Sequence, residues 1–197
     1  MVVYELSRLT SRYDLPGLLK GDERQYLPFV EIGVDKGLFA EQIVRRWPGI
    51  YIGVDPWGFV AGYPERHRSA EDMAEARRRI SLHKNVKDFI LLQMTSSEAF
   101  SWYSLNVSMP IGMVYIDGNH LEDYVFEDLC LWSKLVVNGG YICGHDIICP
   151  NEVGGGWGPG IQKALSRYAD EIGRDLTVYL LRESSGEPWS FYFKAGI

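Results

Sequence analysis

Short apolar runs rich in Val, Ile and Tyr alternate along this chain with longer segments in which apolar residues recur every three or four positions. The first kind of segment is typical of buried strands, and the second of amphipathic helices. Their regular alternation predicts an α/β fold, a doubly wound, mostly parallel, Rossmann-like sheet with helices on both faces. The chain has 197 residues, 46% of them hydrophobic, so we expect one domain over residues 1–197.

The pattern places seven strands and five helices. The strands are expected at Phe29–Ile32, Tyr51–Val54, Phe89–Leu92, Gly112–Ile116, Tyr141–Cys143, Val178–Leu181 and Ser190–Phe193. The helices are expected at Gly37–Trp47, Ala70–His83, Ser97–Ser104, Leu121–Val137 and Gly160–Glu171. The sequence Asn-Gly-Gly after Val137 predicts the end of the fourth helix. Residues 1–21 are expected to cover part of the site.

The charge balance narrows the class of partner. Formal net charge is −6, from 20 Lys and Arg against 26 Asp and Glu, so no basic field exists to attract nucleic acid or an anionic membrane. The start of the chain lacks the apolar core of a signal peptide, and no run of about 18 apolar residues occurs. We expect a cytoplasmic protein with a small-molecule partner, without nucleic acid or membrane. A homo-oligomer is left open.

The stretch PFVEIGVDKGLFAEQIV, residues 28–44, joins an expected strand to an expected helix through a bare loop. Gly33 and Gly37 remove side chains where a ligand would approach the backbone, and ligands of open parallel sheets bind after such strands. The loop lacks the GK[ST] of phosphate loops and the closely spaced GxGxxG of dinucleotide sites. Glu31 and Asp35 would repel a diphosphate, which favours a ligand with a positive group.

The next expected strand, YIGVD, ends in Asp55. A carboxylate at this position accepts hydrogen bonds from both hydroxyls of a ribose, and Trp57 would pack over the ribose or the adenine. A nucleoside with a cationic tail and no phosphate is S-adenosylmethionine, which we infer as the cofactor. The alternative is a tight turn in which the glycines serve only packing.

A third segment, FILLQMTSSEAF, runs from a strand into a helix. Thr95 and Ser96 would reach the edge of the adenine, with Met94 on its face. An ordinary helix N-cap closed by Glu98 is the other interpretation. The two are compatible, because both place these side chains at the edge of the pocket.

Two later strands end in titratable side chains. Asp117 ends one strand and His120 follows it, while His145 and Asp146 end the next. Two carboxylates that face each other repel, which raises the pKa of one of them, and a divalent cation would remove that repulsion. Oxygen ligands suit Mg²⁺ or Mn²⁺, so we infer Asp117 and Asp146 as metal ligands.

From VEIGVDKG through IGVD to IDGNHLEDYVFEDLCLWSKLVVNGGYICGHD, the chain resembles the class I S-adenosylmethionine-dependent methyltransferases. The resemblance is to the branch that contains sugar O-methyltransferases of natural-product pathways and cephalosporin hydroxylase-like proteins. It covers about residues 29–146. It implies S-adenosylmethionine-dependent methylation of a small-molecule hydroxyl, assisted by Mg²⁺ or Mn²⁺.

The resemblance also implies roles for individual residues. The cofactor's methionine part would lie on Glu31, Gly33 and Gly37, its ribose on Asp55, and its adenine on Thr95 and Ser96. Asp117 would stand beside the transferred methyl and, with Asp146, hold the metal. Either His120 or His145 would act as the base.

The sequence departs from the family pattern at two places. Asp35 replaces the middle glycine of the commoner first loop, where it would salt-bridge the cofactor's ammonium or tilt its tail. No third acidic metal ligand adjoins Asp146, because His145 precedes it and Ile147 follows.

Two other functions remain open from the sequence. The crevice would equally bind an adenosyl ligand without methylating anything, or carry out a different reaction. A dinucleotide is disfavoured by the acids of the first loop. The segment GGGWGPG, residues 154–160, would be either a lid with Trp157 at its tip or a plain connector whose Gly-Pro opens the next helix.

Overall fold

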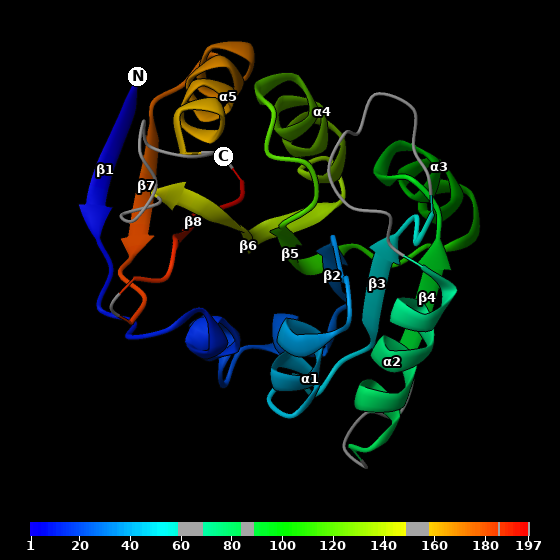
Figure 1. Ribbon diagram of the computed structural model, residues 1–197. Coiled ribbons are helices and arrows are strands. Elements are labelled where there is room, and N and C mark those ends of the chain that lie inside the picture. The colour runs from blue at the N-terminus through cyan, green and yellow to red at the C-terminus, as the bar shows by residue number, and fades with distance from the viewer. Residues whose placement is uncertain (59–68, 84–88, 149–157, 185, 197) are drawn as a thin grey trace.

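The computed structural model describes residues 1–58, 69–83, 89–148, 158–184 and 186–196. In this part of the chain the strands form one eight-stranded sheet in the order β1-β7-β8-β6-β5-β2-β3-β4 (Figure 1). All pairings are parallel except those of β8, which runs antiparallel to β6 and β7. The strands are β1 (Val2–Leu6), β2 (Phe29–Ile32), β3 (Tyr51–Asp55), β4 (Phe89–Gln93), β5 (Ile111–Ile116), β6 (Val136–Ile148), β7 (Leu176–Leu181) and β8 (Trp189–Lys194).

Helices cover both faces of the sheet. In Figure 1, α3, α4 and α5 lie on one face, and α1 and α2 lie on the other. Their bounds are α1 (Leu38–Val44), α2 (Ala70–Ser81), α3 (Ser96–Asn106), α4 (Glu122–Trp132) and α5 (Gly158–Glu171), with two 3-10 helices, η1 (Arg12–Leu19) and η2 (Glu23–Tyr26). The predicted doubly wound, mostly parallel fold is therefore confirmed.

The core follows from strands that are buried on both faces. Every residue of β2, β3 and β5 is buried, as expected for central parallel strands with helices on each side. One apolar cluster includes Trp132 and Phe191, and the second includes Phe39 and Tyr115, whose rings stack with centroids 4.1 Å apart. Each buried Val, Leu or Ile side chain contributes about 1.5–3 kcal/mol, so this core fixes the positions of the strand ends.

The strand count differs from the prediction of seven. All seven are present, and β1 adds an eighth at the edge of the sheet, paired in parallel with β7. Four of its five residues are exposed, so it lacks the alternation that marks a half-buried strand. After β1, η1 packs against α1 through the buried residues Leu15 and Leu19.

The predicted helix 121–137 ends earlier than expected. Helix α4 stops at Trp132, and Val136 already pairs with Ile111 as the start of β6. The Asn-Gly-Gly sequence lies within β6, where Gly139 has φ +82° and the register with β5 shifts. The glycines therefore bend a strand and do not terminate a helix, because two adjacent valines favour the extended chain.

The segment 154–160 is described only from residue 158 onward. Gly158 and Pro159 open α5, as the connector interpretation predicts. Trp157 and the rest of the proposed lid lie outside the described residues. Among the helices that the structure describes, none is long and apolar enough to span a bilayer.

Candidate active site

The sheet reverses its strand order between β2 and β5. From β2 the chain continues outward to β3 and β4, and then returns to β5 on the other side of β2. The carboxyl ends of strands at such a switch point form the usual ligand crevice of an open α/β sheet. The first loop, residues 33–37, leaves β2 here, and Asp117 follows β5.

The first loop passes very close to the neighbouring strand end. Gly33 has φ +91°, and a Cβ atom there would lie 2.1 Å from the backbone oxygen of Asp117. Its N–H donates to the carbonyl of Val54 at 2.8 Å. Gly37 is the N-cap of α1 with φ +74°, and a Cβ there would come within 2.9 Å of Ala76 Cα. Both predicted glycines are thus required by the backbone itself.

Asp55 fixes the first loop through hydrogen bonds to backbone N–H groups. Its side chain is fully buried, and its two oxygens accept hydrogen bonds from the backbone N–H groups of Asp35 and Trp57, each at 2.9 Å. The Trp57 indole is 2% exposed and donates to the carbonyl of Asp35 at 2.8 Å. Asp35 and Trp57 both have positive φ. The structure gives these residues a part in shaping the loop, while their predicted contacts with a ribose or an amine stay predictions.

Glu31 lies below the crevice. It is 1% exposed, and its carboxyl accepts a hydrogen bond of 2.7 Å from the hydroxyl of Tyr51. Burial raises the pKa of Glu31 well above its usual range, against the opposing effect of that hydrogen bond. Its predicted contact with the cofactor's methionine part stays a prediction.

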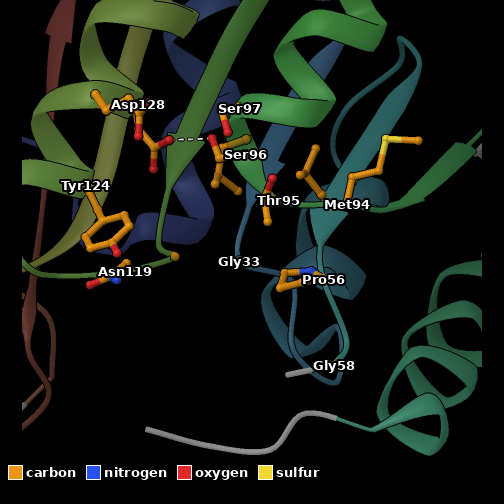
Figure 2. A pocket seen from close by; sticks show the side chains of 14 residues that line it. Gly33, Pro56, Gly58, Met94, Thr95, Ser96, Ser97, Asn119, Tyr124 and Asp128 are labelled. Carbon is orange, nitrogen blue, oxygen red and sulfur yellow. Dashed lines mark hydrogen bonds between the residues drawn. The ribbon is translucent and has the colours of Figure 1, made fainter. Parts of the chain in front are cut away.

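A cavity opens beside the first loop, between β3, β4 and α4 (Figure 2). Its volume is about 190 Å³, far above the roughly 10–15 Å³ that one water occupies. Figure 2 shows Met94 and Pro56 on one side and Asn119, Tyr124 and Asp128 on the other. The remaining lining residues are Ile32, Gly33, Val54, Gly58, Thr95, Ser96, Ser97, Gly118 and Glu127.

The lining fits an adenosyl group. Its walls combine apolar side chains such as Met94 with polar groups at the ends of β4 and β5, the composition expected of a small-ligand site. Asn119 Nδ2 is buried and has no hydrogen-bond partner within the described part of the chain, so it offers a donor for a ring nitrogen. None of the described lining residues is Lys or Arg, which disfavours a diphosphate.

The predicted pair Thr95 and Ser96 lies in this lining. Thr95 caps α3 and forms a complete capping box with Glu98, so the N-cap interpretation is confirmed. The Ser96 hydroxyl donates to the Asp128 carboxyl and accepts a hydrogen bond of 2.8 Å from the Trp132 indole. Ser96 therefore orients Asp128 at the cavity wall (Figure 2), and contact of either residue with adenine stays a prediction.

Asp128 is a buried acid that the sequence analysis did not identify. It is 5% exposed, and burial raises its pKa to about 7, although the hydrogen bond from Ser96 opposes this change. Position 128 falls on the buried face of α4 between Val125 and Leu129. A charged residue on an otherwise apolar helix face is the signal that would have identified it.

Replacing Asp128 with asparagine should make the protein more stable at pH 8. Between the ordinary pKa of about 4 and the folded-state pKa of about 7, the unfolded chain binds fewer protons than the folded one, so the wild type loses stability as pH rises. Asparagine does not titrate and keeps an oxygen for Ser96. We expect a gain of at least about 1 kcal/mol at pH 8 and a much smaller difference at pH 4, measured by urea unfolding.

Asp123→Asn is the matched control for that experiment. Asp123 is an exposed acid of the same helix and pairs with Arg167 at 2.7 Å, and exposed pairs contribute about 0–1 kcal/mol. Its effect should change little between pH 4 and pH 8. Equal pH dependence in the Asp128→Asn variant and the wild type would show that Asp128 is ionised in the folded protein.

The acids and histidines of β5 and β6 meet at one point, as predicted. His120 Nε2 lies 2.9 Å from Asp146 Oδ2 and 3.4 Å from Asp117 Oδ1. His145 Nδ1 lies 3.2 Å from Asp146 Oδ1 and 3.8 Å from Asp117 Oδ1. We call Asp117, His120, His145 and Asp146 the Asp-His cluster.

The charges of the cluster compensate one another. Burial lowers the pKa of His120, but the hydrogen bonds and charges of Asp117 and Asp146 outweigh it and raise the pKa to about 9. Burial likewise tends to raise the pKa of Asp146, but the two imidazoles outweigh it and hold the pKa below its usual range. The Asp146 carboxylate therefore remains ionised beside positive charge.

The same donors form a candidate metal site. One ligand atom each from Asp117, His120 and Asp146 lies within 4.8 Å of the others. Two carboxylates and one imidazole fit Mn²⁺ or Mg²⁺ with water completing the shell. The sequence analysis identified the two acids as ligands, and the geometry adds His120 as a possible third.

Arg12 reaches the cluster from the N-terminal segment. Its Nη1 hydrogen-bonds to His145 Nε2, and since a guanidinium only donates, the His145 proton lies on Nδ1, toward Asp146. Sequence reasoning missed Arg12 because η1 is irregular and distant in the chain, and no local pattern indicates its position. Residues 1–21 thus reach the site through this side chain.

Residues 30–147 match the model of a family described as a methyltransferase domain. A search of curated proteins found no significant match.

Several solved structures share the fold at low identity. An O-methyltransferase from Bacillus cereus in complex with SAH has a TM-score of 0.66 at 15% identity, with 95% of this chain and 83% of that chain covered. TomG, an O-methyltransferase of tomaymycin synthesis from Streptomyces achromogenes in complex with SAM, has a TM-score of 0.64 at 16% identity, with 93% of this chain and 79% of TomG covered. An rRNA methylase from Streptococcus thermophilus has a TM-score of 0.57 at 12% identity, with 93% of each chain covered.

Proposed function

Because this chain belongs to the family of methyltransferase domains, we propose that it is an S-adenosylmethionine-dependent O-methyltransferase that acts on a hydroxyl of a small molecule. The match spans well over half of the chain and confirms the resemblance that the sequence motifs indicated. The observation that carries the proposal is the cavity at the switch point, which adjoins the Asp-His cluster across Gly33 and Gly118.

The cofactor would lie along the first loop and in the cavity. When bound, S-adenosylmethionine supplies a methyl group on a positively charged sulfonium. Asn119 and Thr95 would contact its adenine, and the bare backbone at Gly33 would permit its approach to Asp117. These residues come from three strand ends of one rigid sheet, which holds donor and acceptor in line for the displacement.

The Asp-His cluster would prepare the acceptor hydroxyl. Asp117 and Asp146 would hold Mg²⁺ or Mn²⁺, which lowers the pKa of a bound hydroxyl. We assign His120 as the base in its neutral form, which is the minor form at neutral pH because the pKa is raised to about 9. The proton that it takes up at Nε2 is then held between two carboxylates. His145 would position Asp146, since its own Nε2 already accepts from Arg12.

Two alternatives make different predictions. A noncatalytic adenosyl-binding domain would retain the cavity but would not need the Asp-His cluster. An RNA substrate is named for two of the structural neighbours, but the net charge of −6 is opposite to what phosphate contacts require. The clustering of two acids and two histidines within hydrogen-bonding distance favours catalysis on a small molecule.

Methyl transfer is tested directly with purified protein, S-adenosylmethionine and Mg²⁺ or Mn²⁺, incubated with sugars, phenols and a structured RNA. Mass spectrometry should detect S-adenosylhomocysteine together with a methylated small hydroxyl compound, and the His120→Gln variant should lose about 10²–10⁴-fold in rate. A methylated RNA, or a rate that His120→Gln leaves unchanged, would refute the proposal.

A further inference from the structure

Arg12 is a cation placed among acids at the edge of the crevice. Its Nη1 contacts His145, which lies beside Asp117 and Asp146 in the Asp-His cluster. Glu31 lies in the nearby strand β2, and Asp35 lies on the loop that follows it. Among the described residues, no carboxylate forms an ion pair with the Arg12 guanidinium within 4.0 Å. The site therefore contains a permanent positive charge that the described protein groups do not neutralise by direct contact.

The position of Arg12 is fixed from several sides. Its backbone N–H donates to Glu183 Oε1 at 2.9 Å, and the same oxygen accepts from the Ser190 hydroxyl at 3.0 Å. Its guanidinium carbon lies 5.5 Å from the ring centroid of Tyr13 and 5.8 Å from that of Phe39. Held against two rings, the planar guanidinium is preorganised, so little entropy is lost when it binds a ligand.

The guanidinium has more donors than its protein contacts use. An arginine carries five N–H donors in a fork that matches the two oxygens of a carboxylate or phosphate. The hydrogen bond to His145 uses one of them, and the contact with the Tyr13 hydroxyl uses a second. From this placement we propose that Arg12 binds an anionic group of the acceptor, so that the substrate is a hydroxyl compound that carries a carboxylate or a phosphate. This proposal rests on the methyltransferase function proposed above.

A carboxylate near Arg12 has two possible sources, the acceptor and the amino-acid tail of the cofactor. The cofactor cavity is lined by the ends of β2, β3 and β4, by Gly118 and Asn119 after β5 and by α4, and Arg12 is not in its lining. Arg12 contacts His145 of β6, on the opposite side of Asp117 from that cavity. Its contact with His145 of the Asp-His cluster, which would act on the acceptor, favours the acceptor. Its packing on Phe39, two residues after Gly37, leaves the cofactor's tail within reach, so the test separates the two sources.

The test uses pairs of hydroxyl compounds that differ in one anionic group. Catechol is compared with 3,4-dihydroxybenzoate, and glucose with glucuronate and with glucose 6-phosphate. Calorimetry measures their binding to the S-adenosylhomocysteine complex with Mg²⁺, in wild type, Arg12→Gln and Arg12→Lys. Arg8→Gln, which changes an exposed arginine of the same N-terminal segment, is the matched control. S-adenosylhomocysteine and 5′-methylthioadenosine, which lacks the amino-acid tail, are titrated into every variant.

At least one anionic compound should bind wild type more tightly than its neutral partner does. Arg12→Gln should lower the affinity for that anionic compound about 10–100-fold. Arg12→Lys should retain part of it, and Arg8→Gln all of it. S-adenosylhomocysteine should bind every variant equally.

Two results would overturn the assignment. In the first, no anionic compound is preferred by wild type although S-adenosylhomocysteine binds. In the second, Arg12→Gln weakens the binding of S-adenosylhomocysteine but not that of 5′-methylthioadenosine, which would show that Arg12 binds the cofactor's carboxylate. Failure of wild type to bind either nucleoside would instead refute the methyltransferase proposal itself, and this inference with it.

Discussion

Asparagine in place of Asp146 should lower kcat by about 10²–10³-fold while the Kd for S-adenosylmethionine changes by less than about twofold. Asp146 lies 2.9 Å from His120 and 3.2 Å from His145, and it is not part of the cavity lining. On the proposed mechanism, loss of its charge would remove one metal ligand and one partner of the imidazolium, both of which would act on the acceptor side. Steady-state kinetics with saturating Mg²⁺ and calorimetry measure the two quantities separately.

The substitution is suited to the backbone at this position. Asp146 has φ +57°, and Asn tolerates the left-handed region about as well as Asp does, so the fold should be retained. Asp123→Asn serves as the control for loss of a surface charge, and its kcat should equal that of wild type. Weakened cofactor binding in Asp146→Asn, with kcat unchanged, would place Asp146 in the cofactor site and contradict its assigned role.

Alanine in place of Gly33 should destabilise the protein by about 3 kcal/mol or more, or prevent it from folding. The added Cβ would lie 2.1 Å from the Asp117 carbonyl oxygen and 2.5 Å from its carbonyl carbon. Both atoms belong to the backbone of a buried strand end, so neither yields by rotating a side chain. Either the first loop or the end of β5 must move, and any protein that does fold should lose S-adenosylmethionine affinity.

Gly173→Ala separates the steric clash from the cost of the backbone angle. Gly173 has φ +65°, and a Cβ there would meet nothing within 4 Å, so that variant should lose only about 1–2 kcal/mol. Urea unfolding of the two variants gives the comparison. If Gly33→Ala costs no more than Gly173→Ala, the close approach of the first loop to Asp117 is not present in solution.

Much of the fold was predictable because its central strands are buried on both faces. Phe29–Ile32 was predicted at its exact bounds, and Tyr51–Val54 lacked one residue. Such strands carry continuous apolar runs that sequence reasoning recognises well. Strand β1 was missed because its exposed edge position imposes no such pattern, and the start of β6 was assigned to a helix because apolar spacing alone continued past Trp132.

The candidate site was predictable where acidic residues and histidines lie near the ends of strands. Asp117 and His120 follow β5, and His145 and Asp146 lie in the adjacent parallel strand β6 just after its last pair with β5, so the topology brings them together. Asp128 and Arg12 were missed for different reasons. Asp128 depends on which face of α4 lines the cavity, and Arg12 depends on a contact between residues 133 positions apart. Asp55 was identified, but its hydrogen bonds to the first loop appear only in three dimensions.

We propose that the bare loop after β2 and the adjoining cavity bind an adenosyl cofactor. Calorimetric titration of the purified protein with S-adenosylmethionine, with and without Mg²⁺ and with NAD as the comparison ligand, tests it most directly. We expect saturable binding of S-adenosylmethionine in both buffers and none of NAD, since the described lining holds no cation for a diphosphate. Binding of NAD, or no binding of S-adenosylmethionine in either buffer, would contradict it.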